Sequence, residues 1–143
     1  MSRASSSSAA PRAVYSKEEL ADIYSLAKMS LETGQVKRAE TILRGLTTVA
    51  PEFVPGWLAM AVCHSTLGNP ELAQDAARRA LKIQTDSAAA MMLLVTAALT
   101  LGDVGTAGTY LGEVGELVDQ GRIADPNLLR LYKMQMARFS QGK

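Results

Sequence analysis

Cysteine, histidine and aromatic residues are scarce in this chain of 143 residues, and their scarcity excludes several kinds of protein. The one cysteine, Cys63, cannot form an internal disulfide, which favours a reducing compartment such as the cytoplasm. The one histidine, His64, cannot build a zinc site with a second histidine. No phosphate-binding loop, nucleophile elbow or metal-ligand cluster occurs in the sequence. We therefore expect no enzymatic activity, no cofactor and no metal.

The chain also lacks a dominant charge and a long apolar run. Fifteen basic residues face fourteen acidic ones, a balance that argues against a nucleic-acid partner. The most apolar window, residues 88–101, is shorter than the about 20 residues that span a bilayer, so we expect no stable membrane insertion. Residues 1–14 are rich in Ser and Ala without an apolar run, which predicts a disordered tail rather than a secretory signal. A transit peptide is the weaker alternative for this stretch.

What the chain does contain is a regular internal repeat. Hydrophobic residues make up 48% of the sequence and aromatics 5%, so the core is built from Ala, Leu, Val and Met, which suits packed helices. Three glycines stand at equal intervals along the chain, and an alanine follows each of them by five positions: Gly34, Gly68, Gly102 and Ala39, Ala73, Ala107. A glycine ends a helix at low steric cost, and an alanine permits two helices to cross closely. The pattern predicts three helix–turn–helix units with a period of about 34 residues.

Helix boundaries follow from capping residues. Ser16 with Glu19 predicts a capping box at the first helix. Asparagine or aspartate is expected to cap four later helices: Asn69, Asp86, Asp103 and Asp125. The predicted helices cover residues 16–33, 36–49, 54–67, 70–84, 87–101, 104–119 and 126–140, and no segment predicts a strand.

This spacing resembles the tetratricopeptide repeat (TPR) family, with the best match in the second repeat at Trp57, Gly68, Ala73 and Ala80. The resemblance implies an all-α, right-handed TPR solenoid in residues 15–143. Its repeats would span about residues 20–53, 54–87 and 88–121, and a capping helix would follow at 126–140. The solenoid would present a concave groove lined by the first helix of each repeat.

Carried over by register, the partner-binding residues of that groove are mostly apolar: Tyr24, Lys28, Leu31, Leu58, Val62, Met92, Thr96 and Leu99. Such a lining suits a protein client that offers an amphipathic helix or an extended apolar peptide. An alternative is that the register is off by one and these residues are core. TPR proteins that hold acidic tails of heat-shock chaperones use Lys, Asn and Arg in the groove. The corresponding positions here are Tyr24, Lys28, Ala59, Ala89 and Leu93. Only Lys28 among them is cationic, which argues against a heat-shock chaperone as the client.

The short chain, its repeat number and segments such as 23–27 and 57–61 are similar to TPR chaperones of bacterial type III secretion. That similarity implies a cytoplasmic chaperone or adaptor that holds a needle or translocator subunit before export. It also allows a small co-chaperone or a homodimer as further partners. The alternative is a generic TPR scaffold in another assembly, with no export role.

Two features of the C-terminal third need a structural reason. Four glycines fall on one stripe of the predicted helix 104–119: Gly105, Gly108, Gly112 and Gly115. Each costs about 0.8–1 kcal/mol relative to Ala, so a close helix neighbour is expected; a frayed or kinked last repeat is the alternative. The last helix carries one apolar stripe and is expected to cap the solenoid or, less simply, to dock a partner: Leu128, Leu131, Tyr132, Met136 and Phe139.

Overall fold

The computed structural model describes residues 14–142, so the predicted N-terminal tail lies, apart from Val14, outside the described residues. Within this range the chain forms seven α-helices and no strand. Their bounds are α2 Lys17–Glu32, α3 Val36–Val49, α4 Val54–Thr66, α5 Pro70–Ile83, α6 Ala88–Leu101, α7 Val104–Asp119 and α8 Pro126–Gln141. These bounds agree with the predicted helices to within one residue at each end.

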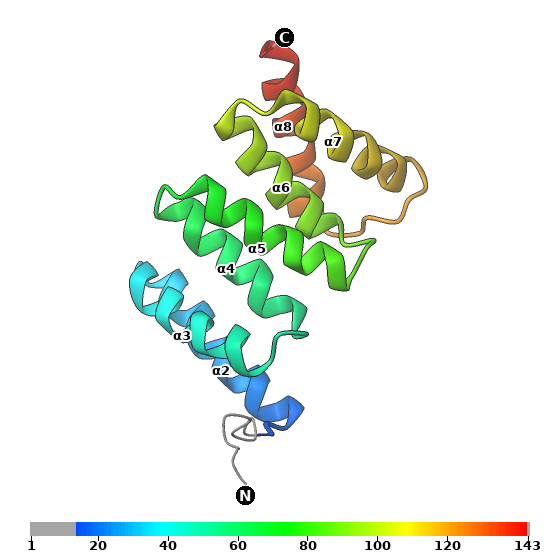
Figure 1. The fold of residues 1–143 in the computed structure, drawn as a ribbon. Helices are drawn as coiled ribbons and strands as arrows, with labels where there is room; N and C mark the ends of the chain where they lie inside the picture. The colour runs from blue at the N-terminus through cyan, green and yellow to red at the C-terminus, as the bar shows by residue number, and fades with distance from the viewer. Residues whose placement is uncertain (1–13, 143) are drawn as a thin grey trace, which may run out of the picture.

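The helices pair as three helix–turn–helix repeats that stack in a row (Figure 1). The pairs are α2 with α3, α4 with α5, and α6 with α7, and each pair contacts the next along the chain. The last helix, α8, packs against both α6 and α7 and lies behind them in this view. This arrangement confirms the predicted solenoid of three repeats with a C-terminal capping helix.

The regular spacing of the three glycines has a direct structural cause. Gly34, Gly68 and Gly102 have φ angles of 81°, 79° and 76°, in the left-handed region that glycine adopts without strain. Each of them stands in the turn that follows the first helix of its repeat. The alanines five residues later are buried, which lets the second helix of each repeat approach the first closely.

Three of the predicted caps form. The Ser16 hydroxyl accepts from the Glu19 backbone N–H at 3.0 Å, and the Glu19 carboxylate accepts from the Ser16 N–H at 2.8 Å. The Asp103 carboxylate accepts from the Thr106 N–H at 3.1 Å, and Asp125 caps α8 in the same manner. These bonds satisfy N–H groups that the first helical turn leaves without partners.

A fourth predicted cap, Asn69, stands at the N-cap position and Pro70 begins α5 as predicted, although the Asn69 side chain makes no capping hydrogen bond with a described residue. The fifth, Asp86, is wrong. At α6 the cap is Ser87 instead of Asp86, because the helix begins at Ala88 and the Ser87 hydroxyl accepts from the Ala90 N–H at 3.1 Å. The Asp86 carboxylate lies 3.6 Å from the Arg122 guanidinium, so it ties the start of α6 to the segment after α7.

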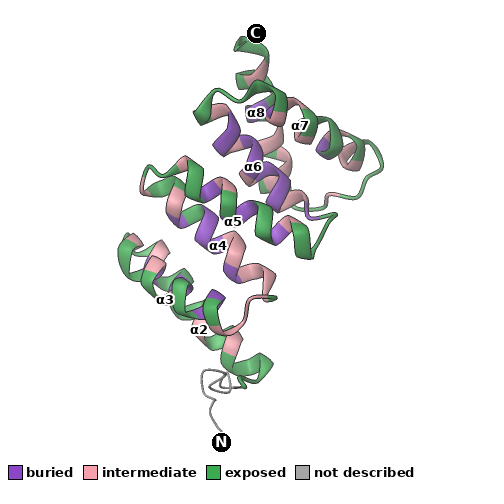
Figure 2. Ribbon diagram, in the orientation of Figure 1, coloured by how far each residue is buried: buried purple, intermediate pink, exposed green. Residues whose placement is uncertain are grey.

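Buried residues concentrate along α4 and α6, the first helices of the second and third repeats (Figure 2). One core cluster joins the first two repeats, and a second joins α6 and α7 with the apolar face of α8. The buried residues of both cores are Ala, Leu, Val and Met, together with Cys63, as the composition predicts. No described helix combines the length and the apolar character needed to cross a membrane.

Candidate functional site

The first helices of the repeats and α8 together enclose an apolar recess of about 390 Å³, which we call the inner groove. Its lining comes from α2 (Tyr24, Lys28, Leu31, Glu32), α4 (Leu58, Ala59, Val62), α6 (Ala89, Leu93) and α8 (Leu128, Leu131). Among these lining residues, Lys28 and Glu32 carry charge, and both stand on α2. The inner groove is therefore an apolar trough with its charges at one end.

Tyr24 anchors that charged end. Its ring packs edge-on against Phe53, with the ring centroids 5.9 Å apart and the planes 77° apart. The Lys28 ammonium lies 5.7 Å from the centroid of the Tyr24 ring, within the range of a cation–π contact. The two contacts hold Tyr24 as part of the wall and keep the Lys28 charge close to the groove.

Five of the predicted partner-binding residues meet in the inner groove: Tyr24, Lys28, Leu31, Leu58 and Val62. They come from the first two repeats, and Val62 keeps 40% of its surface exposed. The positions Ala59, Ala89 and Leu93, which a heat-shock clamp would fill with polar residues, line the same recess. The repeat register thus placed the groove wall correctly over α2 and α4, while the binding role of these residues stays a prediction.

The register failed in the third repeat. Met92 is fully buried in the core cluster shared by α6, α7 and α8, so its predicted exposure in the groove is wrong. The Thr96 hydroxyl donates to the Met92 carbonyl at 3.0 Å and accepts from Gln135 Nε2 of α8 at 3.3 Å. Leu99 is half-buried against the same cluster. The prediction treated the third repeat like its predecessors, but α8 covers these positions of α6.

α8 covers part of α6 and supplies part of the groove wall itself. Leu128 and Leu131 form part of the inner groove wall, while Tyr132 and Phe139 pack into the second core cluster. Met136, expected on the same stripe, instead keeps 37% of its surface exposed. Gln135 is the most buried residue of α8, although its polar type gave no sign of it. The predicted cap is therefore also the end wall of the groove, a role that the sequence did not indicate.

The glycine stripe of α7 divides into two halves. A Cβ on Gly108 would stand 3.2 Å from the Phe139 ring, and one on Gly115 would stand 2.8 Å from the Tyr132 hydroxyl. These two positions permit the close approach of α8 that the stripe predicts. A Cβ on Gly112 would meet nothing within 4 Å, and one on Gly105 would meet only the Asp103 carboxylate at 3.8 Å. No packing neighbour among residues 14–142 explains the glycines at positions 105 and 112.

The remaining reactive side chain, Cys63 of α4, is buried in the first core cluster and does not line the groove. Burial raises the pKa of its thiol to about 11, and the nearby negative charge of Glu40 adds to the effect. The thiol is therefore protonated at neutral pH. Among the described residues, no group of three or more His, Cys, Asp and Glu side chains is placed to hold a metal ion.

Comparison with known proteins finds similarity in structure but not in sequence. No protein-family profile matches the chain, and no curated protein matches its sequence. The Yersinia enterocolitica type III secretion chaperone SycD, in complex with a peptide of the translocator YopD, matches with a TM-score of 0.77 and 17% identity over 89% of this chain and 94% of that chain. PcrH from Pseudomonas aeruginosa matches with a TM-score of 0.77 and 19% identity over 93% and 98%.

The same fold occurs outside secretion chaperones. The C-terminal TPR-containing domain of a Plasmodium falciparum FK506-binding protein matches with a TM-score of 0.69 and 16% identity, covering 91% of this chain and 97% of that domain. At such identities the likeness shows the fold alone, which is the TPR-type helical solenoid.

Proposed function

We propose that this protein is a TPR chaperone or adaptor that holds an apolar segment of a client protein in its inner groove. The observation that carries the proposal is the groove itself, a recess whose lining is apolar apart from Lys28 and Glu32. A concave apolar surface of this kind, bordered by few polar groups, is typical of a binding site. An amphipathic helix or an extended peptide with apolar anchors would fill it.

Binding would protect the client by mass action. Burying an aggregation-prone apolar face in the groove lowers the concentration of free client. A few central anchors should supply most of the affinity, and Leu58 and Val62 stand in the middle of the lining, between α2 and α6. Lys28 and Glu32 stand together on α2, so a charged flank on the client would fix which way the segment lies.

The nature of the client is inferred from the neighbours in fold. SycD has been solved with a peptide of the translocator YopD, and PcrH with the chaperone-binding regions of PopD and PopB. These complexes support a type III secretion subunit, either a needle or a translocator protein, as the client before export from the cytoplasm. An alternative dimer of SycD supports a homodimer as a further proposal, and a small co-chaperone would be a separate partner.

A second candidate function is a generic TPR scaffold in another multiprotein assembly. The Plasmodium falciparum domain favours it, because a protein of a different kind shares the fold at a TM-score of 0.69. The two candidates differ in the client, so identification of the client separates them.

The test is capture of the client from native lysate by tagged wild-type protein and two variants. Leu58→Glu places a charge in the groove, whereas the control Met134→Glu places the same charge on α8 at a side chain that is 62% exposed and outside the groove. We expect wild type and Met134→Glu to capture one small filament-forming or pore-forming protein, and Leu58→Glu to lose it with unchanged helical content by circular dichroism. Equal capture by Leu58→Glu would show that the client docks elsewhere. Capture of unrelated large enzymes through the groove would favour the scaffold.

A further inference from the structure

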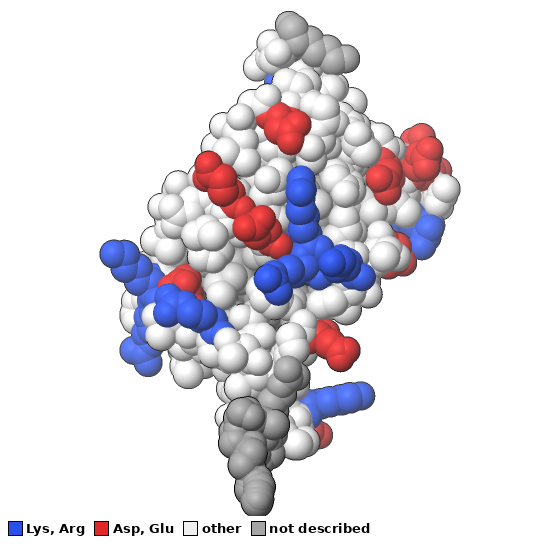
Figure 3. All heavy atoms as spheres, viewed as in Figure 1, with Lys and Arg blue, Asp and Glu red and all other residues white. Residues whose placement is uncertain are grey.

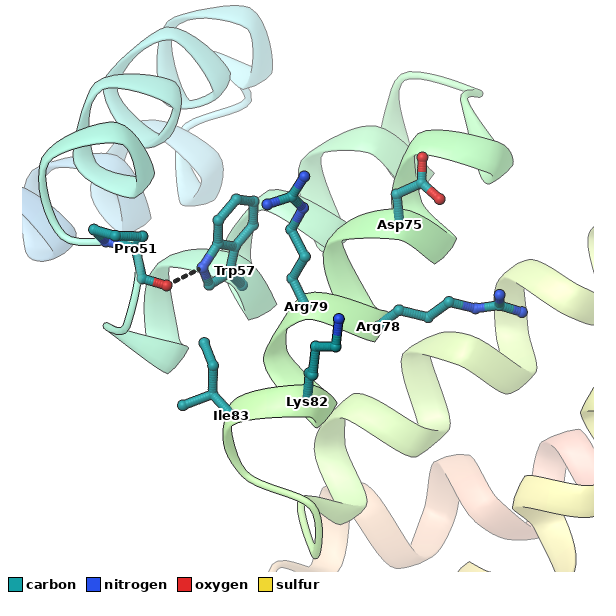
Figure 4. A pocket seen from close by; sticks show the side chains of 7 residues that line it. All are labelled: Pro51, Trp57, Asp75, Arg78, Arg79, Lys82 and Ile83. Carbon is teal, nitrogen blue, oxygen red and sulfur yellow. Dashed lines mark hydrogen bonds between the residues drawn. The ribbon is translucent and has the colours of Figure 1, made fainter.

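A second recess, of about 590 Å³, opens on the outer surface of the solenoid, and we call it the outer hollow. Pro51 and Trp57 form one wall, and Arg78, Arg79, Lys82 and Ile83 of α5 form the other (Figure 4). Figure 3 shows one group of Lys and Arg side chains over α5 in the middle of this face, with acidic side chains beside it. The outer hollow shares no lining residue with the inner groove.

The cations of the outer hollow are crowded, and no carboxylate of the described residues lies within ion-pair distance of them. Arg78, Arg79 and Lys82 stand within about one turn of α5, and none of them forms an ion pair with a described residue. Asp75 is the only carboxylate in the lining, and it too forms no ion pair with a described residue. Like charges four residues apart on a helix, such as Arg78 and Lys82, destabilise it by about 0.2–0.5 kcal/mol. Arg78 has a longer-range electrostatic interaction with Asp103, but no carboxylate of the described residues lies within ion-pair distance of Arg79 or Lys82.

The wall opposite those cations is rigid. Trp57 Nε1 donates a hydrogen bond of 2.8 Å to the Pro51 carbonyl, which fixes the indole in the turn after α3. The Arg79 guanidinium stacks over this ring, 4.9 Å from its centroid. A guanidinium that stacks through its face keeps its N–H groups available at its edge, in the fork that suits a carboxylate. Arg79 is therefore positioned to receive an anion before any partner arrives.

Apolar surface accompanies the charge. Ile83 keeps 43% of its surface exposed, and Trp57 is half-buried. Beyond Trp57 and Arg79 the outer hollow adjoins a third recess of about 450 Å³, which is lined in part by His64 and Leu72. The His64 Nδ1 atom is buried there without a hydrogen-bond partner among the described residues. A ligand for this surface needs acidic groups that pair with the cations and an apolar group that contacts Trp57 and Ile83.

We propose that the outer hollow docks an acidic segment of a protein partner. Its carboxylates would pair with Arg79 and Lys82, and an apolar side chain beside them would pack on Trp57 and Ile83. The apolar wall and the Asp75 carboxylate favour a peptide over a polyphosphate or nucleic acid, which would present charge alone. Because the two recesses share no residue, the acidic partner binds while the inner groove holds its client.

The probe is a fluorescein-labelled peptide of glutamates around a central leucine, with fluorescence anisotropy as the readout. The double variant Arg79→Gln/Lys82→Gln removes two charges from the outer hollow. The matched control Lys37→Gln/Arg38→Gln removes two charges from exposed positions of α3 outside it. We expect the first pair to weaken binding by at least about tenfold and the control pair to leave it within about twofold. Added salt should weaken the wild-type complex, as screening of exposed charges requires.

Three outcomes would overturn the proposal. Equal losses in both double variants would show unspecific attraction. Loss of peptide binding in Leu58→Glu, with binding kept in Arg79→Gln/Lys82→Gln, would place the peptide in the inner groove. Displacement of the peptide by inorganic phosphate, together with equal affinity for a peptide whose leucine is replaced by serine, would assign the outer hollow to phosphate-like anions. Because Arg79 and Lys82 lie on the surface, unchanged thermal unfolding of the variants checks that folding is intact.

Discussion

Leu58 and Met92 occupy the same position of two successive repeats, yet their surroundings are opposite. Leu58 lines the inner groove, whereas Met92 is fully buried between α6, α7 and α8. Four residues further on, Val62 is 40% exposed, while Thr96 bonds to Gln135 of α8. The repeat sets which way a side chain points, and the next layer along the chain decides whether that direction leads to solvent.

That difference gives the groove its shape. A solenoid must cover the apolar edge of its last repeat, and α8 does so here by packing on α6 and α7. Because Leu128 and Leu131 of α8 also line the inner groove, the groove ends at a wall instead of running past the third repeat. A client segment bound there as proposed would enter over the first two repeats and stop against α8.

The largest expected difference between the open and the covered repeat comes from placing glutamate at the two equivalent positions, 58 and 92. Met92→Glu buries a carboxylate with no cationic partner, so we expect the free energy of unfolding to fall by about 3–5 kcal/mol. Leu58→Glu leaves its charge at the surface of the groove and should lower the free energy of unfolding by no more than about 1 kcal/mol. Urea unfolding followed by circular dichroism measures both. Equal losses would mean that α8 does not cover the third repeat in solution.

The open groove of the first two repeats does not extend into their core. The reactivity of the buried Cys63 thiol provides a test. The pKa of its thiol is raised from 9.0 to about 11 by burial and then by Glu40, so the thiolate fraction at neutral pH should be about a hundredfold below that of an ordinary cysteine. Alkylation by iodoacetamide should therefore be at least that much slower in native protein than in urea. Rapid native alkylation would indicate that the core beneath the groove opens to solvent.

The same shift fixes the sign of a pH effect. The folded state favours the neutral thiol, so the contribution of Cys63 to stability is complete below about pH 9 and is lost between about pH 9 and about pH 11, as the unfolded thiol ionises first. Wild type should lose stability across this window relative to Cys63→Ala. A constant difference between the two proteins would contradict the buried position of the thiol.

The role of α8 as the end wall predicts a smaller effect on binding. Leu131→Ala removes part of that wall, and we expect the affinity for the client captured by wild type to fall about fivefold, a cost of about 1 kcal/mol. Met134→Ala makes the same truncation at an exposed side chain of α8 outside the groove and should change the affinity little. Titration by isothermal calorimetry compares them. Identical affinities would mean that α8 only caps the core.

The sequence predicted the fold well because its signals are local and repeated. A left-handed Gly34, a buried Ala39 and a capping Ser16 each act within a few residues, and the regular repeat multiplies the first two. The groove wall was predicted correctly over the first two repeats, each of which is followed by a further repeat. Burial of Met92 and Thr96 depends on a contact with Gln135 far along the chain, and a buried glutamine gives no apolar signal. The repeat pattern therefore could not predict the long-range packing of α8 on the third repeat.

The smallest effect separates the two halves of the glycine stripe on α7, beside the covered repeat. Gly112→Ala should raise the free energy of unfolding by about 0.8–1 kcal/mol, because its Cβ meets no atom within 4 Å and alanine is the better helix former. Gly115→Ala gains the same propensity, but its Cβ would stand 2.8 Å from the Tyr132 hydroxyl and force the ring to move. We expect a smaller or reversed change there, measured by urea unfolding. If both variants gain stability equally, α8 does not pack on α7 as closely as the groove wall requires.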